Sequence, residues 1–204
     1  SDGEGGWFIA GGLTGFLSRV LHLKADKSID SLFNSTFDVV DATNPNFGSP
    51  TVKAIAITTS TVYVGGIFDR VDGATRNNAA AFNKTTGVLT SWNPNVTSSD
   101  VANFPAIVNI LAVSTSTVYI GGFFDGVGGQ VRNSLAEVDI TTGAITSWNP
   151  MQYIDINTTP NIYTLVLAST SIFVGGDFSS TTLTVGGLGR DYLAQLNFNG
   201  SSTT

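Results

Sequence analysis

The stretch from Val52 to Pro94 decides the fold, because the chain then repeats it. It reads VKAIAITTSTVYVGGIFDRVDGATRNNAAAFNKTTGVLTSWNP. A second copy, from Val108 to Pro150, reads VNILAVSTSTVYIGGFFDGVGGQVRNSLAEVDITTGAITSWNP. A third copy opens with IYTLVLASTSIFVGGDF from Ile162 to Phe178, and a degenerate copy opens the chain with WFIAGG from Trp7 to Gly12.

The copies are evenly spaced along the 204 residues. Gly-Gly pairs begin at Gly11, Gly65, Gly121 and Gly175, and subtraction gives spacings of 54, 56 and 54 residues. A fixed period in this range is the signature of a repeat architecture. We therefore expect one domain over residues 1–204, with repeat units at about 7–43, 50–96, 106–150 and 160–204.

The copy that starts at Val52 shows the order of strands and turns in one unit. Short segments rich in β-branched residues predict strands. Four are expected, at Val52–Ile57, Thr61–Gly65, Asn78–Phe82 and Val88–Trp92. Asp72-Gly73 marks a turn within a polar loop, and Lys84 to Gly87 reads as a tight hairpin connection. No window carries a sustained helical period, so the sequence predicts an all-β chain of four-stranded antiparallel sheets.

Such sheets repeated around an axis make a β-propeller. The alternative is a β-solenoid, whose coils are usually much shorter than 54 residues. The unit resembles bacterial β-propeller repeats of the delta-60 type. Four motifs carry the resemblance: VYVGG-x-F, the Arg-Asn pair, TTG and SWNP. The resemblance covers nearly the whole chain. It implies a large secreted or cell-surface bacterial protein, in a class where many members have no assigned activity.

Both ends of the repeat array fall inside a unit. The first unit begins at its second strand, and the last has only Asn199 to Thr204 where its fourth strand would lie, so about fourteen strands are expected. This favours a segment of a larger propeller, with a four-bladed disc as the alternative. Another polypeptide, or the remainder of a longer chain, would complete the propeller. Two copies of this chain would meet out of phase, third strand against second, so a simple homodimer is not expected to complete the propeller.

Composition excludes several classes of function. The net charge of −6, a pI near 4.4 and the absence of a basic run argue against nucleic acid. No stretch has the eighteen or more apolar residues of a membrane helix, so no membrane insertion is expected. Cysteine is absent, which excludes disulfides and thiolate metal sites. The connections are rich in Ser, Thr, Asn and Gly, as is typical of extracellular β-proteins.

Arginine and tryptophan recur with the repeat. Arg19, Arg76, Arg132 and Arg190 fall at or near one position of the unit. One possibility is a ring of guanidinium groups that binds carboxylate, phosphate or sugar. The other is that each arginine pairs with carbonyls or an acid of a neighbouring blade. Repetition in every unit favours this second, structural interpretation. Trp92 and Trp148, with Phe33 at the matching place, are expected to pack between blades rather than to stand on a binding rim.

The remaining candidate residues carry weaker signals. Three acidic residues are candidate ligands for Ca²⁺ near a propeller axis: Asp69, Asp125 and Asp177. The alternative is that they are ordinary turn aspartates. No other cofactor is expected. His22, the only histidine, is expected in a strand that faces solvent or a blade interface, because no catalytic partner is evident. The Gly-Gly pairs end strands and open no helix, which excludes a phosphate loop; they are expected to allow close approach between chains.

A binding face is expected on the connections where the units differ most, since function often lies on variable loops of a rigid scaffold. Its candidate residues are Phe47, Phe104, Tyr153 and Leu183. The sequence thus favours a non-enzymatic binding or structural module of a bacterial extracellular or cell-surface assembly. The alternative is a propeller hydrolase or lyase that acts on a carbohydrate or lactone with carboxylates near the central channel.

Overall fold

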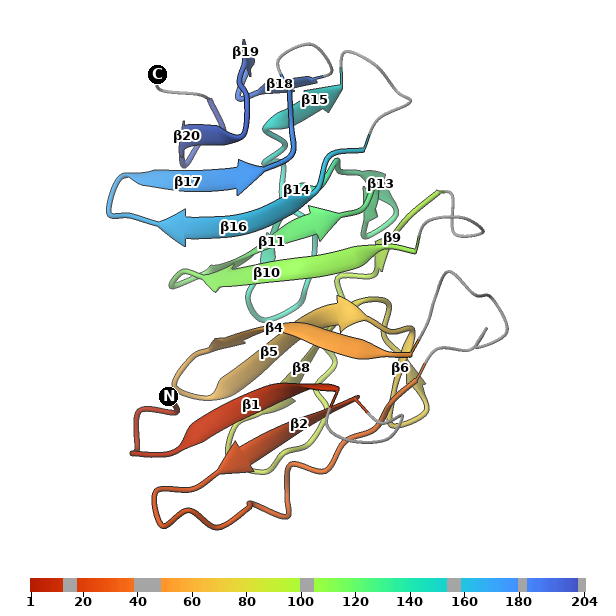
Figure 1. Cartoon of the computed structure of the whole chain (residues 1–204), viewed down its shortest axis with the longest axis vertical. Helices are drawn as coiled ribbons and strands as arrows, with labels where there is room; N and C mark the ends of the chain where they lie inside the picture. Colours follow the sequence, from red (N-terminus) through yellow and green to blue (C-terminus); the bar gives the residue numbers. More distant parts are fainter. Residues whose placement is uncertain (13–17, 39–48, 100–104, 154–158, 180–182, 202–204) are drawn as a thin grey trace.

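In a computed structural model, residues 1–12, 18–38, 49–99, 105–153, 159–179 and 183–201 are described. These ranges contain twenty β-strands and no helix, so none of their residues forms a helix that could cross a membrane. Every strand pair is antiparallel, as the sequence predicts. Four large sheets stack along the longest axis, and the N- and C-terminal units lie at opposite ends (Figure 1).

Each large sheet is one repeat unit. The first strands of units 2, 3 and 4 are β4 (Thr51–Ile57), β10 (Ile107–Val113) and β16 (Ile162–Leu167). The second strands of units 1 to 4 are β1 (Trp7–Gly12), β5 (Thr61–Ile67), β11 (Thr117–Phe123) and β17 (Ser171–Gly176). The third strands are β2 (Ser18–Leu23), β8 (Ala79–Asn83), β14 (Leu135–Asp139) and β20 (Leu193–Asn197). The second strand is central in units 2 to 4.

The fourth strand is much shorter than the sequence predicts. In unit 2 the expected strand at Val88–Trp92 is a single bridge between Phe82 and Leu89. The Thr90 amide still donates to the carbonyl of Ala81 at 2.8 Å, whereas the Thr90 carbonyl accepts a hydrogen bond from the Arg76 guanidinium at 2.7 Å. Equivalent single bridges occur at Ile29 in unit 1 and Ile145 in unit 3.

Small three-stranded sheets join consecutive units. The first contains β3 (Phe37–Asp38), β6 (Arg70–Val71) and β7 (Ala74–Thr75). The second contains β9 (Val96–Thr97), β12 (Gly126–Val127) and β13 (Gln130–Val131). The third contains β15 (Met151–Tyr153), β18 (Leu183–Val185) and β19 (Leu188–Gly189). In each, the segment leaving one unit pairs with a hairpin of the next.

These hairpins replace the polar loop that the sequence predicts around Asp72-Gly73. Both turn residues have positive φ, 50° at Asp72 and 77° at Gly73. Positive φ at both central residues is typical of a type I′ turn, which matches the twist of a hairpin. Strands of two residues are too short to show an alternating pattern, which explains why the sequence alone does not reveal them.

Strand register corrects the alignment of unit 1. Phe8 pairs with His22 as Tyr63 pairs with Ala81, so Ala10-Gly11 is equivalent to Gly65-Gly66. The repeat in unit 1 therefore starts one residue earlier than the glycine pair suggests. The same register places Arg19 opposite Gly11, two residues away from the position that Arg76 occupies in unit 2.

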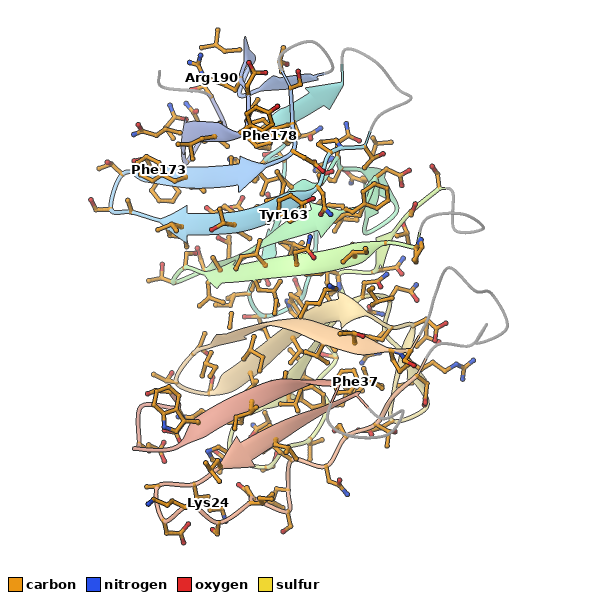
Figure 2. All side chains as sticks on the ribbon, in the orientation of Figure 1. Lys24, Phe37, Tyr163, Phe173, Phe178 and Arg190 are labelled. Atoms are coloured by element: carbon orange, nitrogen blue, oxygen red, sulfur yellow. The ribbon has the colours of Figure 1, made fainter. Side chains whose placement is uncertain are left out.

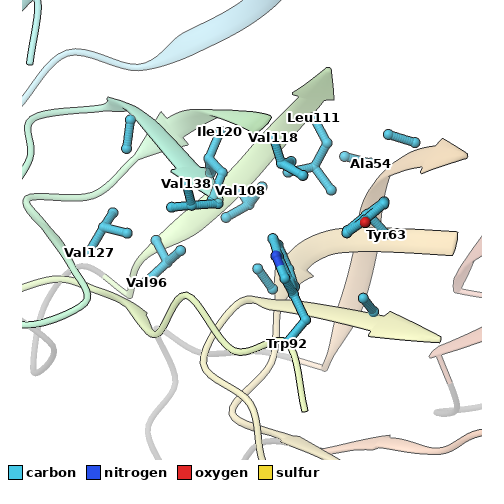
Figure 3. Packing of buried hydrophobic residues seen from close by; sticks show 14 of the residues in the cluster. Ala54, Tyr63, Trp92, Val96, Val108, Leu111, Val118, Ile120, Val127 and Val138 are labelled. Carbon is cyan, nitrogen blue, oxygen red and sulfur yellow. The ribbon is translucent and has the colours of Figure 1, made fainter. Parts of the chain in front are cut away.

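The core consists of three apolar clusters, one at each boundary between consecutive units. At the boundary between units 2 and 3, the cluster includes Tyr63 and Trp92 from unit 2 and Val108, Val118 and Ile120 from unit 3 (Figure 3). The first strands of these units, β4 and β10, lie against each other, as do β10 and β16 at the next boundary. The units are therefore held together face to face by side chains.

Candidate functional site

The boundary between units 2 and 3 is organised around Trp92. Its indole is 1% exposed and packs edge-on against Tyr63, with ring centroids 5.1 Å apart. The indole N–H donates to the carbonyl of Asp139 in unit 3 at 3.0 Å, and the Tyr63 hydroxyl donates to the carbonyl of Ile140 at 2.8 Å. Trp92 thus joins two units, in the position where the sequence places a packing residue.

The aromatic contact recurs at the other boundaries, but the hydrogen bond does not, since the buried Trp148 indole N–H has no hydrogen-bond partner among the described residues. Trp148 packs edge-on against Tyr119 at 5.3 Å, between units 3 and 4. Phe33 packs against Phe8 at 4.8 Å and against Phe82 of unit 2 at 6.4 Å. Burial raises the pKa of Tyr119 to about 12, with a hydrogen bond to Glu137 acting in the same direction. Its phenol therefore stays protonated at physiological pH.

The repeated arginines bind carbonyl groups of their own unit. The guanidinium of Arg76 donates to the carbonyls of Thr75 and Thr90, and that of Arg132 donates to the carbonyls of Val131 and Thr146. Arg190 contacts the carbonyl of Gly189 at 3.5 Å, and only the backbone of Arg19 is described. Arg76 and Arg132 thus fix the hairpin to the segment that carries the boundary tryptophan, which differs from the expected contact with a neighbouring blade.

The three candidate calcium ligands lie in three different units. The Asp125 carboxylate accepts a hydrogen bond from the Ser99 amide at 2.9 Å, and the Asp177 carboxylate accepts one from the Tyr163 hydroxyl at 3.1 Å. The amide of Asp69 donates to the carbonyl of Asp38 in the preceding connection. Within the described ranges, no group of three acidic or histidine residues is close enough to hold a metal ion. Each aspartate instead contacts the segment that leads into its unit.

Two of the four residues that the sequence places on a binding face lie next to each other. Tyr153 in β15 and Leu183 in β18 are backbone partners in the third small sheet. Phe47 and Phe104 lie outside the described residues.

A polar cluster at the boundary of units 1 and 2 has no equivalent among the described residues of the other units. His22 in β2 lies between two carboxylates: its Nε2 is 2.9 Å from Asp2, and its Nδ1 is 3.0 Å from Asp30. The imidazole stacks on the Phe8 ring with a centroid distance of 4.3 Å. Both ring nitrogens are therefore engaged by carboxylate oxygens.

Two lysines complete this cluster, and one of them, Lys84, attaches the first residues of the chain to unit 2. Lys84 donates to the carbonyl of Asp2 at 2.7 Å and contacts the Glu4 carboxylate at 3.1 Å, while Lys24 lies 3.6 Å from Asp30. The sequence gives no signal for the cluster, because Asp2 is twenty residues from His22 in a segment without a strand pattern.

The carboxylates of the cluster are held in the ionised form. Hydrogen bonding from His22, with the amides of Glu4 and Gly6, lowers the pKa of Asp2 from 3.8 to about 2. Burial acts to raise the pKa of Asp30. Hydrogen bonds from His22 and the Leu32 amide and the charge of Lys24 together outweigh burial, so this pKa is also lowered.

Acidification is expected to release residues 1–6 before the rest of the fold. Because the pKa of Asp2 is lower in the folded chain, its carboxylate stabilises the fold above the unfolded value of 3.8. This contribution is lost as the pH falls toward about 2. The Gly6 amide, which donates to Asp2 at 2.8 Å, should then lose its protection from hydrogen exchange.

Hydrogen exchange followed by NMR across this pH range is the measurement. In Asp2→Asn the pH dependence at Gly6 should disappear. Asp26→Asn is the matched control, because Asp26 binds only the neighbouring Ser28 among the described contacts. An unchanged pH profile in Asp2→Asn would contradict the assignment.

A groove of about 760 Å³ opens beside Trp92 between units 2 and 3. Hydroxyl groups line it, among them Thr58, Ser60 and Ser114. At the preceding boundary Lys84 stands where unit 3 has Ile140. Residues 1–4 there line a smaller groove of about 620 Å³ together with Thr58 and Thr59.

Comparisons with known proteins identify no relative for this chain. No protein-family model matches it, and neither does any curated protein.

Proposed function

We propose that the chain is an arc of a β-propeller that serves as a non-enzymatic binding or structural module of a bacterial extracellular or cell-surface assembly. The observation that carries this proposal is the repeated boundary between units, where an aromatic side chain, a glycine and a first strand pack in the same way. Contact between consecutive first strands is also what blades around a common axis require. The resemblance to delta-60 repeats supports the same architecture and location.

A binding face on this module would lie along one edge of the stack. In units 2 to 4 a hairpin follows the second strand, so all three small sheets are at the edge where the second strands end (Figure 1). Three of the connections that vary between units leave the small sheets after β3, β9 and β15 and lead into the first strands β4, β10 and β16. Since a rigid scaffold with variable loops is a common basis for recognition, we propose this edge as the binding face. Another polypeptide, or the rest of a longer chain, would complete the propeller.

A catalytic role has less support. A hydrolase or lyase needs an acid or base directed at an open cavity. Both nitrogens of His22 are paired with carboxylates, and Asp125 and Asp177 bind neighbouring backbone or side-chain groups. The proposal therefore includes no cofactor and no reaction.

The proposal is tested by fractionating the producing cells with an antibody against the chain and viewing the recovered particles by negative-stain electron microscopy. We expect the chain in the medium or at the cell surface, in ring-shaped particles with a central channel. Recovery only from the cytoplasm would contradict the location, and straight rods would contradict the propeller. Hydrolysis of carbohydrates or lactones by the particles above the buffer rate would favour the enzymatic alternative.

A further inference from the structure

The groove beside Trp92 is formed by residues of two units. Three turns converge on it: the turn between the first and second strands of unit 2, the same turn of unit 3, and the turn after β14. They contribute residues 58–61, 114–115 and 140–141. The small sheets follow the other end of the second strands, so the groove lies at the opposite edge of the stack (Figure 1). It is therefore separate from the proposed binding face.

The hydroxyl groups that line this groove have two different roles. Those of Thr58 and Ser114 shape their own turns, because each accepts a hydrogen bond from the amide three residues later, at 3.0 and 2.9 Å. The side chains of Thr59, Thr115 and Thr141 are exposed, and their hydroxyls have no hydrogen-bond partner among the described residues. A hydroxyl can both donate and accept hydrogen bonds. Three such groups are thus available to a ligand.

Apolar groups form the inner side of the groove. Ile140 is half-buried, and the rings of Tyr63 and Trp92 lie together at the boundary with 3% and 1% of their surface exposed (Figure 3). The hydroxyl and the indole N–H of these rings already donate to carbonyls of unit 3. This side therefore offers a ligand apolar contact and no free donor.

The third strands indicate why this boundary is open. The residue opposite the aromatic side chain of the second strand is His22 in unit 1, Ala81 in unit 2 and Glu137 in unit 3. His22 stacks on the Phe8 ring, and Glu137 is hydrogen-bonded to the Tyr119 hydroxyl. Ala81 ends at its methyl group, so no charged side chain occupies the equivalent place between units 2 and 3.

The groove also differs in charge from the one at the preceding boundary. None of the described residues that line it is charged. The smaller groove is lined by Asp2, Glu4 and Lys84, and Lys24 of the polar cluster lies farther along, at the N-terminal end of the stack (Figure 2). An ion that entered the uncharged groove would lose hydration without gaining a partner of opposite charge. The groove therefore favours an uncharged ligand.

We infer that the groove between units 2 and 3 binds a short uncharged oligosaccharide. Its volume of about 760 Å³ lies within the range of small-molecule pockets, about 300–1,000 Å³. Sugar hydroxyls both donate and accept hydrogen bonds, as the three free threonine hydroxyls do. The apolar C–H faces of a sugar would pack on Ile140 and on the edges of the two rings. This site goes beyond the proposed function, since it requires only one boundary between units.

A titration of the purified chain followed by two-dimensional NMR tests the inference. The uncharged probes are maltotriose, cellotriose and triacetylchitotriose, and the charged probe is trigalacturonate. We expect saturable shifts of the Thr59, Thr115 and Thr141 amides with at least one uncharged probe. Trigalacturonate should produce none.

Threonine-to-valine variants test the hydroxyls, because valine keeps the branched shape of the side chain. Thr115→Val and Thr141→Val should each weaken the affinity by about three- to tenfold, the effect of losing one neutral hydrogen bond. Thr85→Val is the matched control, since Thr85 holds in unit 2 the turn position of Thr141 and lies outside the groove. It should bind like the wild-type chain, and thermal melting should show the same fold in all three.

Other outcomes would overturn the inference. Saturable binding of none of the uncharged probes contradicts the site, and equal binding of trigalacturonate contradicts its selection against charge. Shifts confined to the small sheets would place the sugar on the proposed binding face, which overturns the groove and leaves the proposed function intact. Equal affinity in Thr115→Val, Thr141→Val and Thr85→Val would show that the groove hydroxyls do not bind the sugar.

Discussion

Replacing Trp92 with alanine is expected to lower the free energy of unfolding by about 3–5 kcal/mol, the usual cost of removing a buried tryptophan or phenylalanine. The indole is 1% exposed, contacts Tyr63 and donates to the carbonyl of Asp139 across the boundary between units 2 and 3. Truncation leaves a cavity and removes the indole hydrogen bond, while the Asp139 carbonyl keeps the hydrogen bond from the Gly143 amide. Since each boundary is a separate apolar cluster, the damage should be greatest where units 2 and 3 meet.

Urea denaturation followed by circular dichroism measures this loss. Val88→Ala is the matched control, because Val88 lies on the same segment but is 62% exposed. Trp92→Phe should fall between the two, since it keeps much of the packing and loses the hydrogen bond. If Trp92→Ala costs no more than Val88→Ala, the tryptophan does not hold the boundary together.

Adding a single methyl group at Gly65 is expected to cost about 1–3 kcal/mol, as overpacking of a dense core does. The new Cβ of Gly65→Ala would overlap Cγ1 of Val108 and lie 3.0 Å from Cβ of the same residue. Val108 is 0% exposed, so it has no free space to move into. Units 2 and 3 must then separate slightly, which weakens the other contacts of their cluster.

Gly175→Ala is the matched comparison, because it makes the same change at the same repeat position of the last unit. Its Cβ would meet Cγ2 of Thr164 at 2.8 Å, and Thr164 is exposed and can rotate into solvent. We expect a clearly larger shift of the thermal melting midpoint in Gly65→Ala than in Gly175→Ala. Equal shifts would mean that the glycine serves its own unit and not the approach of the next one.

The main strands of the fold are readable from the sequence, and the reasons for the misses are physical. β4, β5 and β8 follow β-branched and small apolar runs bounded by turn residues. The fourth strand is reduced to a single bridge, and beyond it the Thr90 carbonyl bonds to the Arg76 guanidinium, a contact that local sequence pattern does not reveal. The hairpin at Asp72-Gly73 has strands of two residues, which no periodicity can reveal.

The candidate sites are less readable, because they depend on contacts between distant residues. Asp2 and Asp30 reach His22 from a turn and a connection without a motif. Arg19 falls near the arginine position by residue count, yet strand register separates it from Arg76. Trp7 and Phe173 occupy positions that are buried in the other units, and only the arrangement of the units leaves them exposed.

Amide hydrogen exchange followed by NMR tests most directly the central claim that consecutive units are held together by buried side chains at a recurring boundary. In Trp92→Ala we expect faster exchange than in the wild-type chain mainly in β5, β8, β10 and β11, on the two sides of the boundary between units 2 and 3. An equal increase in the strands of all four units, or no increase in these four strands, would contradict the claim.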